Sequence, residues 1–203
     1  MTHDPALLLQ AILRGYVLPL HGYHGVVHWA RVLENGIRVA AANGGDAEVV
    51  RLFALFHDSR RVNEDVDHGH GTRGGDLARV LRGSLVHLDD ARFDLLYEAC
   101  ALHTDGHTTG DPTLLACWDA DRLDLGRVGI VPKPELLCTD MARALLPWAH
   151  ERATSDHVPV AVLASWGMTP ERVGRPAAAG VANRGLIPDD GRDSSFRTSM
   201  NSR

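Results

Sequence analysis

The sequence predicts an all-α fold, and three features support this prediction. Apolar residues recur with the period of an α-helix along most of the 203-residue chain. We find no segment with the period-two alternation that marks a half-buried strand. The segment 47–58, AEVVRLFALFHD, is apolar on almost every face, which is typical of a helix at the centre of a bundle.

Turns and capping residues divide the first part of the chain into helices. The first helix is expected over 5–15, where Gly15 ends it, and a loop follows at 19–25. The second is expected over 26–42 and stops at NGG, because glycine readily adopts the left-handed conformation of a helix C-cap. Asp46 is then the expected N-cap of the apolar segment 47–58.

The same pattern continues after a polar loop at 59–71. The later helices are expected over 72–86, 91–104, 112–124 and 134–154. Asp89 or Asp90 is the expected N-cap of the second of these, and Asp111-Pro112 begins the third with proline in its first position. Pro134 is expected to begin the last helix, and the short apolar segment 158–166 is expected to pack back on the bundle.

The composition changes near residue 175. Residues 175–203 are rich in Gly, Ala, Arg, Asp and Ser and contain few large apolar side chains. Such a segment cannot bury enough apolar surface to offset the entropy lost on ordering. We therefore expect one domain over 1–170 and a flexible, disordered tail over 175–203.

Composition and charge exclude several classes of function. The net charge is −5 and aromatic residues make up 5% of the chain, so neither nucleic acid nor an anionic membrane is an expected partner. Three cysteines without a CxxC pair predict neither a disulfide framework nor a thiolate zinc site. The sequence shows no secretory signal, and its apolar runs are shorter than the roughly 20 residues of a membrane helix. We expect a cytoplasmic protein.

Histidine is the unusual component of this chain. It occurs twelve times, and it is the commonest metal ligand in proteins. His57 and Asp58 end the most apolar segment, where their burial is costly unless they are paired or bind a metal. An imidazole and a carboxylate together suit a divalent ion such as Mn²⁺, Fe²⁺, Zn²⁺ or Mg²⁺. The alternative is a solvated pair at a helix end, which is common for a lone His-Asp dipeptide.

Two other segments place polar residues on apolar helices. His28 begins HWARV inside the second expected helix, with Val32 four residues later. The segment 117–129, CWDADRLDLGRVG, has three carboxylates in a largely apolar helix: Asp119, Asp121 and Asp124. Asp121 and Asp124 share a helix face, whereas Asp119 points about 200° away from Asp121. Metal ligands and a solvated acidic face both fit this pattern.

In this order, HWARV, LFALFHDSRRV and WDADRLDLGRVG resemble the HD-domain superfamily of metal-dependent phosphohydrolases, over about residues 20–130. The resemblance implies a compact all-α HD-domain bundle that holds a divalent metal through His28, His57, Asp58 and Asp121. Asp119 is the alternative last ligand, and we favour Asp121 because it aligns with the aspartate of the superfamily's ADR-type motif. The resemblance also implies that Asp58 is part of the catalytic centre and that the ion is Mn, Mg, Zn, Fe, Co or Ni.

The residues that follow His-Asp depart from one branch of this superfamily. The stringent-response nucleotide hydrolases have an acidic pair there, whereas this chain has Ser59, Arg60 and Arg61. Two arginines beside a metal suit a phosphate, because guanidinium binds phosphate in a bidentate manner and keeps its charge. We therefore include Arg60 and Arg61 among the expected catalytic residues. The alternative is a solvated basic loop whose charge the acidic residues of 64–67 balance.

Further histidines bear on whether the site holds one ion or two. His70, in HGTRGG, and His103, near the end of an expected helix, resemble the extra ligands of binuclear HD proteins. We include both in the metal site, as ligands or as substrate contacts. His24 precedes His28 by one helical turn and is expected to support it. The remaining histidines are assigned no role.

The resemblance implies a metal-dependent phosphohydrolase. Its substrate would be a small-molecule phosphate ester or a nucleotide, cleaved by water activated at the metal. One alternative is a catalytically silent HD-type module that binds metal or nucleotide and acts in regulation. A second is a di-iron oxygenase, since some HD-type proteins with extra histidines oxidise small molecules with O₂.

Overall fold

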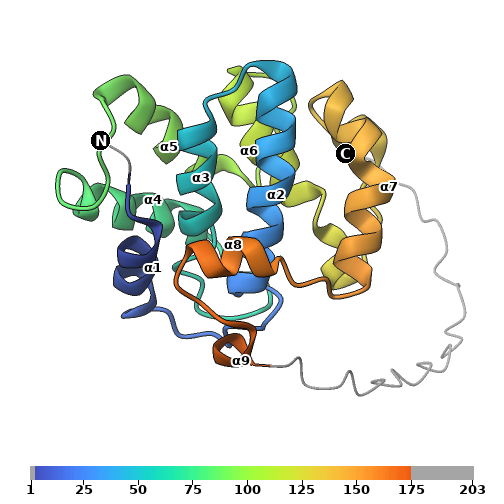
Figure 1. The fold of residues 1–203 in the computed structure, drawn as a ribbon. Helices are drawn as coiled ribbons and strands as arrows, with labels where there is room; N and C mark the ends of the chain where they lie inside the picture. Colours follow the sequence, from blue (N-terminus) through green and yellow to red (C-terminus); the bar gives the residue numbers. More distant parts are fainter. Residues whose placement is uncertain (1–2, 175–203) are drawn as a thin grey trace, which may run out of the picture.

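Helix α3 (Ala47–Phe56) is the apolar element around which the other helices pack. In the computed structural model, which describes residues 3–174, α3 lies against α2 (Val26–Asn43), α5 (Asp90–Leu102) and α6 (Pro112–Arg122). Helices α2 and α6 lie side by side at the centre of the molecule (Figure 1). The all-α prediction is confirmed, because the described residues form helices and no strand.

The remaining helices surround this centre. Their bounds are α1 Pro5–Leu13, α4 His70–Leu81, α7 Asp140–Thr154, α8 Val160–Ser165 and α9 Pro170–Val173, with short 3-10 helices η1 Leu125–Val128 and η2 Pro134–Leu136. Helix α7 packs against α2 on one side, and α8 crosses the same helix (Figure 1). The segment 158–166 therefore packs back on the bundle as expected. The tail expected over 175–203 lies outside the described residues.

The core is centred on the aliphatic and aromatic side chains of α3. Every large apolar residue of this helix is at most 2% exposed: Val49, Val50, Leu52, Phe53, Leu55 and Phe56. Burial of such a side chain contributes about 1.5–3 kcal/mol relative to leaving it in water. His57 and Asp58 follow directly and are buried with the helix, so the apolar core brings two polar groups inside the molecule.

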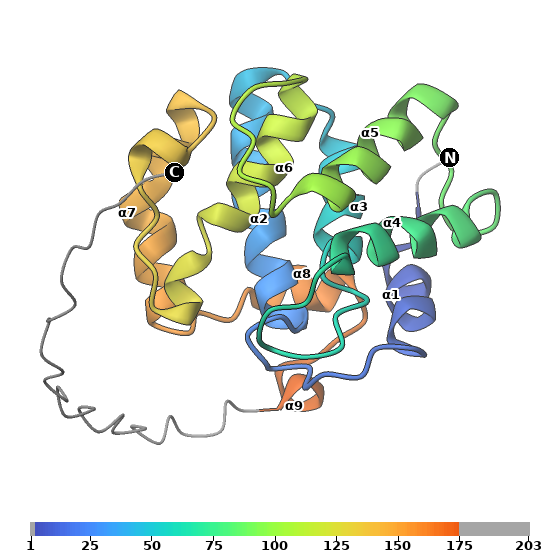
Figure 2. The ribbon, with the colours of Figure 1, turned by 180° about the vertical axis from the view of Figure 1, so that it is seen from behind.

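Helix α4 approaches its neighbours closely because glycines form its inner face. A Cβ atom on Gly71 would lie 2.0 Å from the carbonyl oxygen of Cys100 in α5. One on Gly74 would lie 2.1 Å from the carbonyl oxygen of Phe56 at the end of α3. Larger residues would separate these backbones. Figure 2 shows α4 and α5 together beside α3, an arrangement that brings the first residue of α4 to the end of α5.

Two expected helices differ from those observed. The helix expected over 72–86 covers His70–Leu81, so His70 lies in its first turn rather than in a loop. The helix expected to begin at Pro134 begins at Asp140. Pro134 starts only a short 3-10 turn, because the amide groups of residues 138 and 139 donate hydrogen bonds to the buried Asp119 carboxylate, at 2.6 and 2.9 Å. That tertiary contact overrides the helical signal of the local sequence.

No helix within residues 3–174 combines the length and the apolar character needed to cross a lipid bilayer.

Asp46 provides a test of how α3 is held. Its carboxylate accepts hydrogen bonds from the amides of Glu48 and Val49, and Arg92 donates to it at 2.6 and 2.9 Å. We expect Asp46→Ala to lower the free energy of unfolding by about 1–2 kcal/mol, and Asp46→Asn, which keeps a capping oxygen, by less. Urea unfolding of both variants at pH 7 measures the difference.

The same residue predicts a pH dependence. The hydrogen bond from Arg92, opposed by partial burial and helped by the two amides, lowers the pKa of Asp46. A carboxyl group with a depressed folded-state pKa stabilises the protein above its unfolded pKa, near 4, and loses this effect as the pH falls through the folded value. The stability gap between the wild type and Asp46→Asn should therefore shrink below about pH 4. A gap that stays constant down to pH 2 would contradict this account.

Candidate metal centre

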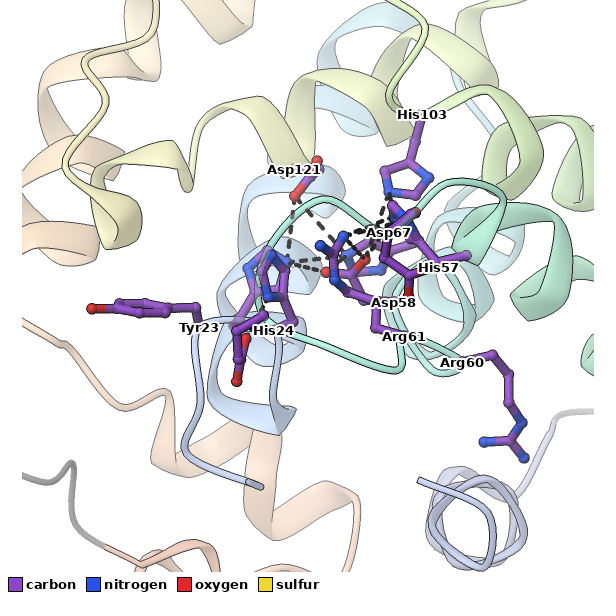
Figure 3. Close-up of polar contacts among 12 residues, drawn as sticks. Tyr23, His24, His57, Asp58, Arg60, Arg61, Asp67, His103 and Asp121 are labelled. Atoms are coloured by element: carbon purple, nitrogen blue, oxygen red, sulfur yellow. Dashed lines mark hydrogen bonds and ion pairs between the residues drawn. The ribbon is translucent and has the colours of Figure 1, made fainter. Parts of the chain in front are cut away.

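Five helix ends meet at one buried cluster of histidine and aspartate side chains (Figure 3). The cluster takes one residue from the first turn of α2, two that follow α3, the first residue of α4, one that follows α5 and one from the end of α6. In that order they are His28, His57, Asp58, His70, His103 and Asp121. The structure thus brings together all six residues that the sequence predicts as metal ligands.

Three of these side chains form the first group of candidate ligands. The Nε2 atoms of His28 and His57 lie 3.0 Å apart. Asp58 Oδ2 lies 3.5 Å from the first of these nitrogens and 3.6 Å from the second. Asp121 Oδ1 reaches the same place, 3.3 Å from His28 Nε2.

The other carboxylate oxygen of Asp58 belongs to a second group, with His70 and His103. The Nε2 atoms of these two histidines also lie 3.0 Å apart. Asp58 Oδ1 lies 3.2 Å from His70 Nε2 and 3.7 Å from His103 Nε2. The Asp58 carboxylate therefore lies between two histidine pairs and directs one oxygen toward each.

Hydrogen bonds at the opposite ring nitrogens set the tautomer of all four histidines. Each Nδ1 atom faces an oxygen that can only accept, so Nδ1 carries a proton in every ring, and the Nε2 of each neutral ring presents a lone pair to the cluster. The acceptors are Asp124 Oδ2 for His28 at 2.7 Å, Phe53 O for His57 at 3.2 Å, Asp67 O for His70 at 2.5 Å and Cys100 O for His103 at 2.7 Å. Metal-binding histidines show this same arrangement.

The cluster has buried acceptor atoms that its own donors do not satisfy. Asp58 Oδ1 and Asp121 Oδ1 are buried without a hydrogen-bond donor among the described residues. Two nitrogen ligands at right angles, each about 2.1 Å from one ion, lie about 3.0 Å apart, which is the separation of both histidine pairs. A cation in each group would satisfy the carboxylate oxygens and the lone pairs together. The donor set of imidazole and carboxylate fits a divalent metal.

Protonation of the cluster follows from burial and from its carboxylates. Burial lowers the pKa of His57 to about 3, so this imidazole is neutral, as a metal ligand must be. Burial and Arg127 also oppose protonation of His28, but the facing carboxylates of Asp121, Asp124 and Asp58 outweigh them and raise its pKa to about 9. A divalent ion bound at this ring would displace a proton from it.

The two aspartates of the cluster remain ionised. Burial opposes their charge, but the facing histidines hold the pKa of Asp58 well below its usual value. For Asp121, the contact with His28 and the charge of Arg127 outweigh burial and lower the pKa in the same direction. Both carboxylates are thus available as anionic ligands at neutral pH.

Asp124 is a positioning residue to which the sequence analysis assigned no role. Its carboxylate accepts a hydrogen bond from His28 Nδ1, and Arg31 donates to both of its oxygens at 2.7 and 3.1 Å. Asp124 is only 1% exposed, so this ion pair fixes the ring of His28 inside the bundle. The sequence feature that could have indicated this role is the position of Asp124, three residues after Asp121 on the same face of the expected helix.

Asp119 and Asp121 have separate roles in the structure. Asp119 is fully buried and accepts hydrogen bonds from the amides of Cys138 and Thr139 and from the Thr139 hydroxyl, at 2.6, 2.9 and 2.7 Å. It joins α6 to the chain before α7 and lies outside the histidine cluster. Of the two alternatives, the geometry brings Asp121 to the histidines.

Arg60 and Arg61, both expected in the catalytic centre, lie in different surroundings. The guanidinium of Arg60 donates to the carbonyl oxygens of Ile12 and Ser59 and points away from the cluster toward α1 (Figure 3). The end of α1 binds this side chain, so the structure does not bring Arg60 to the histidine cluster. Arg61 lies inside, with Nη1 3.1 Å from His70 Nε2 and 3.6 Å from Asp58 Oδ1.

Arg127, from η1, also lies beside the cluster, although no sequence pattern predicted it there. Its Nε donates to the carbonyl oxygen of Tyr23 at 2.7 Å, and its Nη2 lies 3.7 Å from Asp121 Oδ1. The buried Nη1 has no hydrogen-bond partner among residues 3–174. A buried guanidinium with a free donor beside candidate metal ligands suits an anionic ligand.

His24 lies next to the cluster, as expected. Its ring meets that of His28 edge to face, with centroids 6.4 Å apart, and its Nδ1 contacts Glu64 at 2.5 Å. Glu64 therefore has a specific partner, whereas the alternative interpretation of the loop after Asp58 gave it only a balancing charge. This pair ties the loop after Asp58 to the beginning of α2.

Comparison with known proteins supports the fold. No protein-family model matches the chain, and no curated protein is significantly similar to it. Among solved structures, the chain is similar to a predicted HD superfamily hydrolase from an uncultured Thermotogales bacterium, with a TM-score of 0.56 and 22% identity. The match covers 79% of this chain and 92% of the other. The chain therefore has an HD-domain fold.

The two neighbouring aspartates of α6 provide a matched test of the site. We expect Asp121→Asn to weaken Mn²⁺ binding at least about tenfold, because a cluster carboxylate is lost. Asp119→Asn should bind Mn²⁺ normally but lose about 1–3 kcal/mol of stability, because an amide NH₂ would face buried donors. Calorimetric Mn²⁺ titration and urea unfolding in chelator measure the two effects. If Asp119→Asn instead weakened Mn²⁺ binding and Asp121→Asn bound Mn²⁺ normally, Asp119 would be the ligand.

Proposed function

We propose that this protein, which has an HD-domain fold, is a metal-dependent phosphohydrolase acting on a small phosphate ester or a nucleotide. The observation that carries the proposal is the position of Asp58 between two histidine pairs, with one oxygen 3.5 Å from His28 Nε2 and the other 3.2 Å from His70 Nε2. A carboxylate shared in this way is typical of two-metal hydrolytic centres, which stabilise both the attacking and the leaving oxygen.

The proposed ligands divide between two ions. His28, His57, Asp58 and Asp121 would hold one, and Asp58, His70 and His103 the other. When bound, such ions lower the pKa of a coordinated water and polarise phosphoryl oxygens. The nitrogen and oxygen donors fit Mn, Mg, Zn, Fe, Co or Ni as the divalent ion.

The protein itself supplies permanent positive charge near each group. Arg61 lies near the second, fixed by hydrogen bonds from its guanidinium to the carbonyl oxygens of Asn63 and Asp65, at 3.3 and 2.5 Å. Arg127 lies near the first, anchored to Tyr23 O, and its Nη1 is free to donate. Guanidinium groups held in this way offset the negative charge that develops on a phosphoryl group and need little rearrangement.

The loop 59–69 holds Arg61 and His70 in register. Asp67 binds Arg73 through both carboxylate oxygens, at 2.6 and 2.7 Å, and accepts from the Val62 amide at 2.8 Å. Its carbonyl oxygen accepts the Nδ1 proton of His70. Arg61 and His70 are therefore held by a loop that the ion pair between Asp67 and Arg73 closes.

Phosphate release tests the proposal. The protein, stripped with chelator and reloaded in turn with Mn²⁺, Mg²⁺, Zn²⁺, Fe²⁺, Co²⁺ and Ni²⁺, is assayed on a panel of phosphate monoesters and nucleotides. We expect about two ions per chain, turnover that chelation abolishes, and a loss of at least about 100-fold in kcat/KM for His57→Ala and Asp58→Ala. Activity that survives both chelation and these substitutions would contradict the proposal, as would inactivity with every ion.

Two further variants make this experiment specific. His68→Ala changes an exposed histidine outside the cluster and should leave metal content and turnover unchanged. Arg127→Gln should keep both ions but lower kcat/KM by about 100-fold, because one donor to the transition state is lost. A coloured iron form that consumes O₂ and releases no phosphate would instead support an oxygenase. Tight nucleotide binding without turnover would support a regulatory module.

A further inference from the structure

A cavity of about 400 Å³ opens directly beside the candidate metal centre. Asp121, from the first ligand group, and His103, from the second, form part of its wall. Most of the remaining wall is aliphatic and comes from the segment after α6: Leu125, Ile130, Val131, Pro132, Leu136 and Leu137. A molecule in this cavity would contact both ligand groups with one end and hydrocarbon with the rest of its surface.

Several of these apolar side chains are left open to solvent. Ile130 is 51% exposed, Val131 64% and Leu136 53%, although the neighbouring core is buried. Scattered exposed apolar residues are common, but a group that lines one cavity marks a binding site. An apolar ligand would remove this surface from water.

The wall is fixed by hydrogen bonds to its main chain. Arg122 donates to Leu136 O at 2.9 Å, and Arg143 donates to Leu137 O at 2.5 Å. Asp119 binds the amides of the next two residues. These contacts hold the segment 129–139 apart from α7 and fix the backbone of the cavity wall.

Few polar side chains of the cavity are free to recognise a polar substrate. Arg122 lines the cavity, but its guanidinium already donates to Leu136 O and His107 O. Thr104 and Lys133 are the other polar lining side chains apart from the two candidate ligands. A sugar or a nucleobase buried here would leave most of its hydrogen-bonding groups unpaired, which is costly.

We propose that the substrate is a phosphate monoester of an apolar alcohol, with its phosphate at the metal centre and its hydrocarbon body in this cavity. The inference rests on the proposed phosphohydrolase function and specifies its substrate class. In the reaction, the oxygen of water bonds to phosphorus and the bond between phosphorus and the ester oxygen breaks. The alcohol leaves with a proton from the water, and inorganic phosphate is the second product.

A series of alkyl phosphates tests this inference, because lengthening the chain barely changes the reactivity of the leaving group. With the Mn²⁺-loaded protein, we expect kcat/KM to rise at least about tenfold from ethyl to hexyl phosphate. Glycerol phosphate and AMP should be no better than ethyl phosphate. Equal hydrolysis of all these esters would overturn the inference and leave the proposed function standing.

A binding measurement keeps the two proposals separate. If no ester or nucleotide of the full panel is hydrolysed with any of the six ions, the proposed function fails, and calorimetric titration with ethyl- and hexylphosphonate still tests the cavity. We expect the longer phosphonate to bind at least about tenfold more tightly. Equal affinities would overturn the cavity's role.

Two matched substitutions test whether the preference for the longer alkyl chain arises in this cavity. Val131→Asp places a carboxylate in the cavity wall and should reduce the preference for hexyl over ethyl phosphate to nearly one. Val17, which is 68% exposed and outside the cavity, provides the control, and Val17→Asp should keep the full preference. A preference that persists in Val131→Asp, or that Val17→Asp also removes, would contradict the assignment.

Discussion

The Asp58 carboxylate is buried between two pairs of histidine nitrogens, and its charge is the constraint on which the surrounding structure depends. An isolated carboxylate in this interior would be strongly destabilising. Here the pairs His28–His57 and His70–His103 each face one of its oxygens, and the hydrogen bonds at Nδ1 direct the Nε2 atom of all four rings inward. Such an arrangement of acceptors is stable with cations among them, as protons or as metal ions.

The helices are arranged to deliver these groups to one point. Helices α3, α5 and α6 end at the cluster, and the partial negative charge of a helix C-terminus favours a cation there. The apolar packing of α3 carries His57 and Asp58 inside, while the glycines of α4 let His70 meet His103. Ion pairs outside the cluster, notably Arg31 with Asp124, then fix the rings. The apolar cavity beside Asp121 would give the same centre a preference among phosphate esters.

Local sequence predicted much of this structure, and tertiary contacts account for what it missed. The bundle and the central position of α3 follow from helical periodicity, and the ligand order follows from the motif resemblance. Pro134 gave a local helix signal, but the buried Asp119 holds the next residues out of a helix. Arg60 and Arg61 are neighbours of the same type in sequence, but the end of α1 binds Arg60 whereas the loop 59–69 binds Arg61. The place of Arg127 depends on how η1 folds back on Tyr23, which no local pattern encodes.

The most direct test of the central claim is a crystal structure of the Mn²⁺-loaded protein with anomalous scattering. The account predicts two anomalous peaks, one on each side of Asp58. One peak would contact His28, His57 and Asp121, and the other would contact His70 and His103. A metal-saturated crystal with no peak at Asp58, or with manganese bound by Asp119 instead of Asp121, would contradict it.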